Sequence, residues 1–224
     1  MGIHRWVTSG LAAASVCAFS LANAAPSEGN FKAKMSFVSN APGEDIEGTA
    51  EGTAKLSIDL DSPSATSGEV VVSVASMKTG NDRRDEHLRG SKWLDATAHP
   101  DIRFKVTSAT AEPTISKGPV KMAKLQVTGE FSLHGVTKTM TAPAEMKWKA
   151  NKMKVTTAFV VKLADFKVEG AQGVVGSKVA DAIKVEVTLK GAVTQAVPTQ
   201  PAPAQPARAQ PAPAQPADTE PAAQ

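Results

Sequence analysis

The sequence contains almost no cysteine and few aromatic residues. Its one cysteine, Cys17, lies within the first 24 residues, tyrosine is absent, and aromatic residues make up 4% of the chain. A disulfide framework is therefore excluded for everything that follows the first 24 residues. A core in this chain has to be assembled mainly from valine, alanine, leucine and methionine, and it has to be stable through packing alone.

An excess of one sign of charge is also missing. The chain carries 25 basic and 22 acidic residues, a net charge of +3. Without Arg5 in the leader described below, 24 − 22 leaves +2. This balance gives no support for a nucleic-acid partner. No segment beyond the leader is long and apolar enough to cross a bilayer as a helix.

Residues 1–24 have the features of a secretory signal. A short basic start with Arg5 is followed by an apolar run from Val7 to Leu21 and then by Ala22-Asn23-Ala24. This order predicts export and cleavage after Ala24. Ser15 and Val16 give Cys17 a poor context for lipidation, so we interpret it as a residue that is lost with the leader.

Residues 194–224 differ in composition from everything before them. The run Gln-Pro-Ala-Pro-Ala-Gln-Pro-Ala recurs almost unchanged around Arg208. Alanine and proline offer little apolar surface to bury, which predicts a disordered tail with polyproline II character. The alternative is a spacer that contacts the cell envelope. The globular domain is expected to span residues 25–193.

Within that domain, apolar and polar residues alternate in the way typical of half-buried strands. Eight such segments are present, near residues 31–38, 47–61, 68–77, 102–107, 120–133, 136–148, 155–163 and 183–190. Val120 and Met122 are out of phase with Leu125 and Val127, which predicts a bulge near Ala123. Residues 112–118 are expected to form a loop.

The connections between these segments are mostly short turns, and no long helix provides parallel crossovers, so we expect antiparallel pairing. Each segment has one apolar and one charged face. An outer-membrane barrel would need the apolar face outward, and eight strands leave little lumen for so many long charged side chains. We therefore expect an all-β, eight-stranded soluble barrel with an apolar interior, filled by packed side chains or by one small apolar ligand.

The alternation stops between Thr79 and Phe104. Asn81 or Asp82 can cap a short helix that Gly90 ends, and Ser91 can cap a second turn that carries Trp93 and Leu94. Pro100 keeps the residue before it extended. The pattern predicts a short helical insert with an apolar tip between the third and fourth strands.

Charged residues and a histidine gather in this insert. Arg84, Asp85 and His87 are predicted to form a structural network that braces the insert against the barrel rim, because a partly buried guanidinium needs acceptors. The alternatives are a metal site, which the two-residue spacing of Asp85 and His87 disfavours, and a direct contact with a lipid head group. No Gly-x-Ser-x-Gly turn or phosphate-binding glycine loop is present, so no catalytic residue and no metal ligand is predicted.

Several motifs occur in a fixed order along the chain. They are Arg84-Asp85-x-His87-Leu88, Trp93-Leu94-Asp95, Pro100-x-x-x-Phe104, the stretch 127–138, Leu163-Ala164-Asp165-Phe166, and Val175-Gly176 followed by 183–187. Together they resemble the bacterial YceI-like family. The resemblance implies an extended, lipocalin-like antiparallel barrel in the periplasm that holds an isoprenoid or quinone-type lipid and carries no catalytic residues. The sequence departs from the family pattern at 35–40, where a histidine is often found, at His99 and at Lys167-Val168.

The expected function is non-enzymatic binding or transport of such a lipid in the lumen, with no other cofactor, by a monomer or a homodimer. The alternative is an envelope protein with a filled barrel and a Pro-Ala tether. Trp93, Leu88 and Leu94 are candidates for a gate at one mouth. The full set of lumen and gate candidates is Met35, Phe37, Ile58, Val72, Val74, Leu88, Trp93, Leu94, Phe104, Leu125, Val127, Phe131, Met140, Phe159 and Val161.

Overall fold

The computed structural model describes residues 27–41, 44–170 and 179–194, so the predicted leader, the tail and the Val175-Gly176 motif lie outside the described residues. The elements are the strands β1 (Ser27–Ala41), β2 (Glu44–Ile58) and β3 (Ser67–Ser73), the 3₁₀-helix η1 (Val74–Ser76), the helix α1 (Asp82–Arg89), the strands β4 (Asp101–Ala111), β5 (Ile115–Lys117), β6 (Val120–Leu133), β7 (Val136–Lys149) and β8 (Lys152–Lys162), the 3₁₀-helix η2 (Leu163–Phe166) and the strand β9 (Ala182–Thr194).

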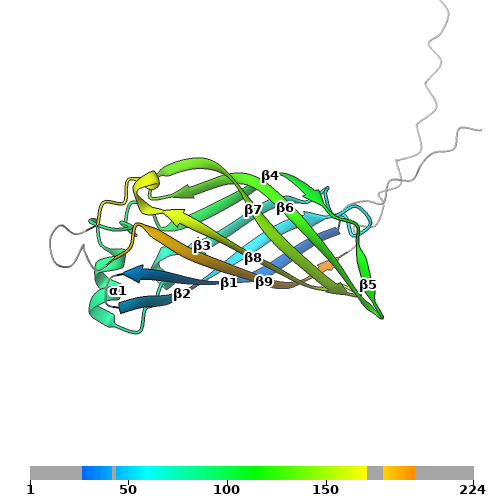
Figure 1. Cartoon of the computed structure of the whole chain (residues 1–224), viewed down its shortest axis with the longest axis horizontal. Helices are drawn as coiled ribbons and strands as arrows, with labels where there is room; N and C mark the ends of the chain where they lie inside the picture. The colour runs from blue at the N-terminus through cyan, green and yellow to red at the C-terminus, as the bar shows by residue number, and fades with distance from the viewer. Residues whose placement is uncertain (1–26, 42–43, 171–178, 195–224) are drawn as a thin grey trace, which may run out of the picture.

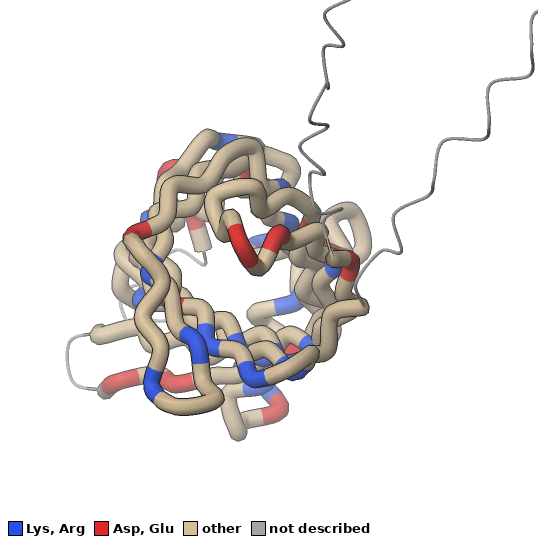
Figure 2. The backbone as a smooth tube through the Cα atoms, turned by 90° about the vertical axis from the view of Figure 1, so that its right-hand side faces the viewer, with Lys and Arg blue, Asp and Glu red and all other residues tan. Residues whose placement is uncertain are grey.

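The strands form one antiparallel sheet that closes on itself. Their order is β4-β3-β2-β1-β9-β8-β7-β6-β5, and β4 also pairs with β6. That last pairing closes eight strands into a barrel and leaves β5 as a short flap on β6 (Figures 1 and 2). The predicted eight-stranded, lipocalin-like barrel with a helical insert between the third and fourth strands is confirmed.

Four local predictions were wrong. Residues 115–117 are a strand rather than part of a loop. The predicted third strand ends at Ser73, before η1 begins at Val74, and the seventh ends at Lys162, before η2. The register of β6 with β7 runs without a shift through Ala123, and the irregularity lies instead in β4, between Val106 and Ser108.

The flap β5 explains the out-of-phase residues of β6. Ile115 pairs with Met122, and Lys117 pairs with Val120. Cross-strand apolar neighbours stabilise a pair of strands on whichever face they share. Met122 therefore packs beside Ile115 and leaves Ala123 and Leu125 facing inward in regular alternation. Val120 and Met122 therefore lie on one face of β6 and Leu125 on the other, and their spacing needs no bulge.

The helix α1 lies at the end of the barrel opposite β5 (Figure 1). Its N-cap is Asn81, whose side-chain oxygen accepts a hydrogen bond from the Arg84 N–H at 3.1 Å, and Gly90 ends it. The following turn is held by the Trp93 N–H, which donates to the Gly90 carbonyl at 3.0 Å. The cap at Asn81 and the helix end at Gly90 expected from the sequence are confirmed, while the cap expected at Ser91 stays a prediction. The following turn sets Trp93 and Leu94 in buried positions above the barrel. No helix in the described part of the chain is long and apolar enough to span a bilayer.

Candidate functional site

The barrel interior contains a cavity of about 880 Å³. Its walls are the inward-facing residues of the strands, and its lining is overwhelmingly apolar. Val70, Phe104, Met140 and Phe159 are only partly buried although they lie in this lining. Apolar side chains that keep accessible surface inside a barrel face an unfilled lumen. A cavity of this size is within the usual range for small-molecule pockets.

A row of side chains at matching register positions shows how the lumen is made. Met35 of β1 is opposite Val187 of β9, which is opposite Thr157 of β8. Thr157 is opposite Ala144 of β7, which is opposite Leu125 of β6. All five residues line the cavity. We call this set the hollow row.

A second row, four residues away along β1, closes the barrel at the β5 end. Phe31 is opposite Gly191, Gly191 is opposite Met153, and Met153 is opposite Trp148. We call these four residues the filled row. Phe31, Met153 and Trp148 are buried, and no member of the row lines the cavity. A Cβ atom on Gly191 would lie 2.7 Å from the Phe31 ring, so glycine here gives the ring its space. The lumen is thus blind at this end.

The other end is covered by the insert. Trp93 lines the cavity and is also packed on its far side against the backbone of Gly170, where a Cβ atom would lie 2.7 Å from the indole. Leu94 is buried beside it, and Leu88 of α1 is partly buried. These three side chains therefore stand between the lumen and the helix end of the barrel.

Every lumen and gate candidate named from the sequence lines the cavity except Val74. Val74 is buried in η1, where the chain has left the strand alternation that placed it inward. Whether the lining residues bind a ligand stays a prediction. The cavity also takes in apolar residues that the sequence had not singled out, among them Ile46, Leu56, Val70, Ile102, Met146, Val155, Ile183, Val185, Val187 and Leu189. Strand alternation alone could have found most of these.

The rim residues of the insert meet at one threonine. The Thr79 N–H and hydroxyl both donate to Asp85 Oδ1, at 2.7 Å and 2.6 Å. Arg84 donates from Nε to Thr79 Oγ1 at 2.9 Å and from Nη2 to the Thr79 carbonyl at 3.0 Å. Asp85 is buried, whereas His87 is exposed and lines the cavity mouth with Arg84. Thr79, which had no assigned role in the sequence, is the shared partner of Arg84 and Asp85.

Arg89 ties the same helix to the strand side. Its Nη1 donates to the Met77 carbonyl at 3.0 Å, and the adjacent Lys78 exchanges backbone hydrogen bonds with Thr49 of β2. The helix is therefore anchored to the barrel at Met77 and braced internally at Thr79. This arrangement is consistent with a bracing role for the insert, which stays a prediction.

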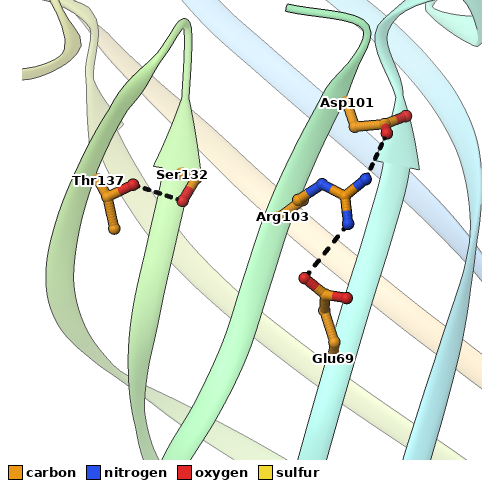
Figure 3. A network of polar contacts seen from close by, with 5 residues as sticks. All are labelled: Glu69, Asp101, Arg103, Ser132 and Thr137. Atoms are coloured by element: carbon orange, nitrogen blue, oxygen red, sulfur yellow. Dashed lines mark hydrogen bonds and ion pairs between the residues drawn. The ribbon is translucent and has the colours of Figure 1, made fainter.

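Two ion pairs lie on strands and loops near the same end. Arg103 of β4 bonds Asp101 at 2.8 Å and Glu69 of β3 at 3.4 Å, close to a hydroxyl pair formed by Ser132 and Thr137 (Figure 3). The hydrogen bonds that Arg103 donates to Asp101 and then to Glu69 raise the pKa of its guanidinium. Although Arg103 also borders the cavity, its ion pairs with Asp101 and Glu69 are solvent-exposed.

Groups able to perform chemistry are sparse. The lining contributed by described residues includes Arg83, Arg84, Arg103 and His87 but no carboxylate, lysine or cysteine. His99 and His134 pack edge to face with ring centroids 5.1 Å apart, outside the lining, a contact that the sequence did not indicate. Among the described residues, no three His, Cys, Asp or Glu side chains gather closely enough to hold a metal ion.

These features define a class: an eight-stranded lipocalin-like barrel with a blind, apolar lumen and a helical cover at one mouth. The model of the YceI-like domain family matches residues 22–191, and the chain belongs to that family.

Curated relatives include protein YceI of Shigella flexneri, 27% identical over 149 residues that cover 64% of this chain and 70% of the relative. Protein YceI of Salmonella arizonae is 28% identical over 149 residues, which cover 64% of this chain and 70% of that relative.

Solved structures agree on the fold. The chain is similar to BcnA of Burkholderia cenocepacia, with a TM-score of 0.60 and 23% identity over 70% of this chain and 95% of that one. It is also similar to a polyisoprenoid binding domain from Saccharophagus degradans, with a TM-score of 0.56 and 15% identity over 77% of this chain and all of that domain.

Proposed function

We propose that this protein is a non-enzymatic carrier that binds an isoprenoid-type lipid, polyprenyl or quinone-like, within its barrel lumen. The observation that carries the proposal is the cavity of about 880 Å³ with partly exposed apolar side chains along its walls. Each ligand methylene moved from water into such a lumen contributes about 0.8 kcal/mol. A polyprenyl chain would thus be retained without a specific hydrogen bond. The polyisoprenoid binding domain with a similar fold supports the same ligand class.

The absence of a catalytic role in this proposal follows from the lining. A general acid or base pair needs titratable groups at hydrogen-bond range of one reacting atom. In the described lining, the titratable groups are three arginines and one exposed histidine, and all of them lie toward the helix end. Away from that end, the lining offers the hydroxyls of Thr66 and Thr157, which donate to the Pro63 carbonyl at 2.7 Å and to the Pro143 carbonyl at 2.8 Å.

The proposal also places the carrier in the periplasm, as a monomer or homodimer. The predicted secretory leader at residues 1–24 and membership of the YceI-like family support this location. Contact with the cell envelope through residues 194–224 is part of the same proposal. Deletion of those residues should leave lipid binding intact and reduce recovery of the protein with envelope fractions.

The deciding experiment is native mass spectrometry of protein purified from its own host, with lipid extraction of the same sample. We expect a bound lipid of several isoprene units. Val127→Trp should abolish the adduct because Val127 lines the lumen, and Gln126→Trp, one residue away on the outer face, is the matched control. Protein that is folded and free of lipid in both the native and the Gln126→Trp forms would contradict the proposal.

A further inference from the structure

The strands β7 and β8 are neighbours in the barrel wall, but they pair over only part of their length. β7 and β8 are paired only between Ala144–Lys149 and Lys152–Thr157. Toward the helix end, β7 continues to Val136 bonded to β6, and β8 continues to Lys162 bonded to β9, but within the described residues they do not bond to each other. Figure 1 shows the two strands separating in this direction. We call residues 136–143 and 158–162 the seam.

The point of separation has a cause in the sequence. Pro143 is the first residue of β7 beyond the paired part, and proline has no backbone N–H to donate to a neighbouring strand. The Pro143 carbonyl is taken by the Thr157 hydroxyl at 2.8 Å, which is the last polar link between the two strands.

Behind the seam lies the lumen. Met140 and Ala142 from β7 and Phe159 and Val161 from β8 all line the cavity. The wall here is held by side chains alone, chiefly by Phe131, whose ring meets that of Phe159 edge to face at 5.9 Å and that of Phe166 at 5.3 Å. Side chains change rotamer far more readily than a hydrogen-bonded ladder breaks.

A latch closes the seam at the helix end. Lys138 of β7 forms an ion pair with Asp165 of η2 at 2.9 Å, and its ammonium lies 5.7 Å from the centroid of the Phe166 ring. The Phe166 carbonyl is in hydrogen-bond contact with His134 Nδ1 at 3.2 Å. Both partners of the ion pair are about half exposed, and exposed pairs of this kind contribute little to stability. The latch can therefore open at small cost.

The outward side chains of residues 137–141 and 158–160 in the seam are uncharged. Its outward residues on β7 are Thr137, Thr139 and Thr141, and on β8 they are Ala158 and Val160, with Val160 55% exposed. The outward positions of other strands carry charge, as with Lys32 and Lys34 on β1 or Glu47 and Glu51 on β2.

Charged groups of both signs border this uncharged surface. The basic residues are Lys138 and Lys162 on the seam strands and Lys184 of β9, which is opposite Val160. The acidic residues are Glu130 of β6, opposite Thr139, Glu186, opposite Ala158, and Asp165 in the latch.

We propose that the seam is a lateral doorway through which the lipid chain passes between the lumen and a bilayer surface pressed against residues 137–141 and 158–160. The inference rests on the proposed lipid-binding function. A long chain leaving end-on past Trp93 would be exposed to water along its whole length, and exposure of apolar surface is unfavourable in proportion to its area. A chain leaving sideways passes between Met140 and Phe159 and then between the outward threonines of β7 and Ala158 and Val160 of β8, which carry no charge to desolvate.

The test locks the seam covalently. The register of Ala144 with Thr157, extended along both strands, sets Thr141 opposite Val160. Thr141→Cys with Val160→Cys, in a Cys17→Ser background, is joined with a short bismaleimide. The matched control joins Thr156→Cys with Thr188→Cys, a pair that already faces across the bonded strands β8 and β9.

The readout is transfer of a fluorescent geranylgeraniol between the protein and vesicles of phosphatidylethanolamine and phosphatidylglycerol. We expect the locked seam to slow uptake and release by about tenfold or more, equivalent to about 1.4 kcal/mol in the barrier. The control crosslink should leave both rates unchanged. Lys138→Met, which removes the latch without a crosslink, should speed transfer while equilibrium binding stays the same.

Unchanged rates in the locked protein would overturn the doorway and leave the helix end as the route. Failure of the uncrosslinked protein to take up the probe at all, together with lipid-free native mass spectra, would overturn the proposed function and the doorway with it. If the locked protein binds the probe normally at equilibrium and transfers it at unchanged rates, only the doorway is contradicted. If the uncrosslinked protein does not bind the probe, the proposed function is contradicted as well.

Discussion

The filled row and the hollow row share the strands β1, β9, β8 and β7 and lie four residues apart on β1. The side chains of the filled row close the barrel, whereas those of the hollow row surround an empty lumen. In the filled row, Phe31, Met153 and Trp148 meet across Gly191, and the large side chains occupy the space that the glycine leaves. In the hollow row, Val187, Ala144 and Thr157 are too small to reach the far wall. In both rows the strands keep the regular alternation of inward and outward side chains. The difference between the rows therefore lies in the volume of their inward side chains. This explains how a chain with few aromatics can be stable and hollow at once.

The largest expected effect sharpens that contrast. Trp148→Ala should destabilise the fold by about 3–5 kcal/mol, because it removes a buried aromatic from close packing. Phe159→Ala borders the cavity and is only partly buried, so its cost should be clearly smaller. Urea denaturation followed by circular dichroism measures both. Equal costs for the two variants would show that the lumen wall is packed as tightly as the blind end.

The cover at the helix end depends on polar contacts as well as on packing. Asp85→Ala should cost about 1–3 kcal/mol, because the Thr79 N–H and hydroxyl would lose a buried acceptor. Asp82→Ala, in the first turn of the same helix but exposed, is the control and should change stability far less. The measurement is thermal unfolding together with hydrogen exchange of residues 79–95. Protection lost only in that segment would show that the cover opens independently of the barrel.

The Trp93 side chain can be displaced by a substitution at its neighbour Gly170, which leaves the tryptophan itself in place. Gly170→Ala puts a Cβ at φ +70° and within 2.7 Å of the indole, so it should cost about 1–2 kcal/mol and speed ligand release. Gly118→Ala has a similar backbone, with φ +59°, but its Cβ meets nothing within 4 Å. The difference between these two variants isolates the contact with Trp93 from the backbone strain. Identical release rates would remove Trp93 from the gate.

The sequence predicted the barrel because alternation, short turns and helix caps are local signals. It placed Phe37, Val127 and Phe159 on the inner face for the same reason, and each lines the cavity. Val74 was misplaced because nothing in residues 70–74 marks where the strand turns into η1.

The role of Thr79, the seam at Pro143 and the contact of Trp93 with Gly170 were beyond reach of the sequence. Each depends on the register between strands or on residues far apart in the chain. The filled and hollow rows could not be predicted from the sequence either, because only the register between strands shows which inward residues lie at the same level of the barrel.

The smallest expected effect concerns the latch of the seam. The hydrogen bond from Lys138, and then its charge, lower the pKa of Asp165 below its ordinary value of 3.8. A carboxyl with a depressed pKa in the folded state stabilises the fold above its ordinary pKa, and this contribution is lost as the pH falls through the depressed value. Lipid transfer should therefore speed up slightly as the pH falls below about 4. The Asp165→Asn variant should transfer lipid at the faster rate already at neutral pH, and it should lose this pH dependence. Lys162, the other charge close to residue 165, is present in the variant and in the native protein. If lipid transfer by the Asp165→Asn variant also speeds up at low pH, the effect comes from other carboxylates. The seam would then open without this ion pair.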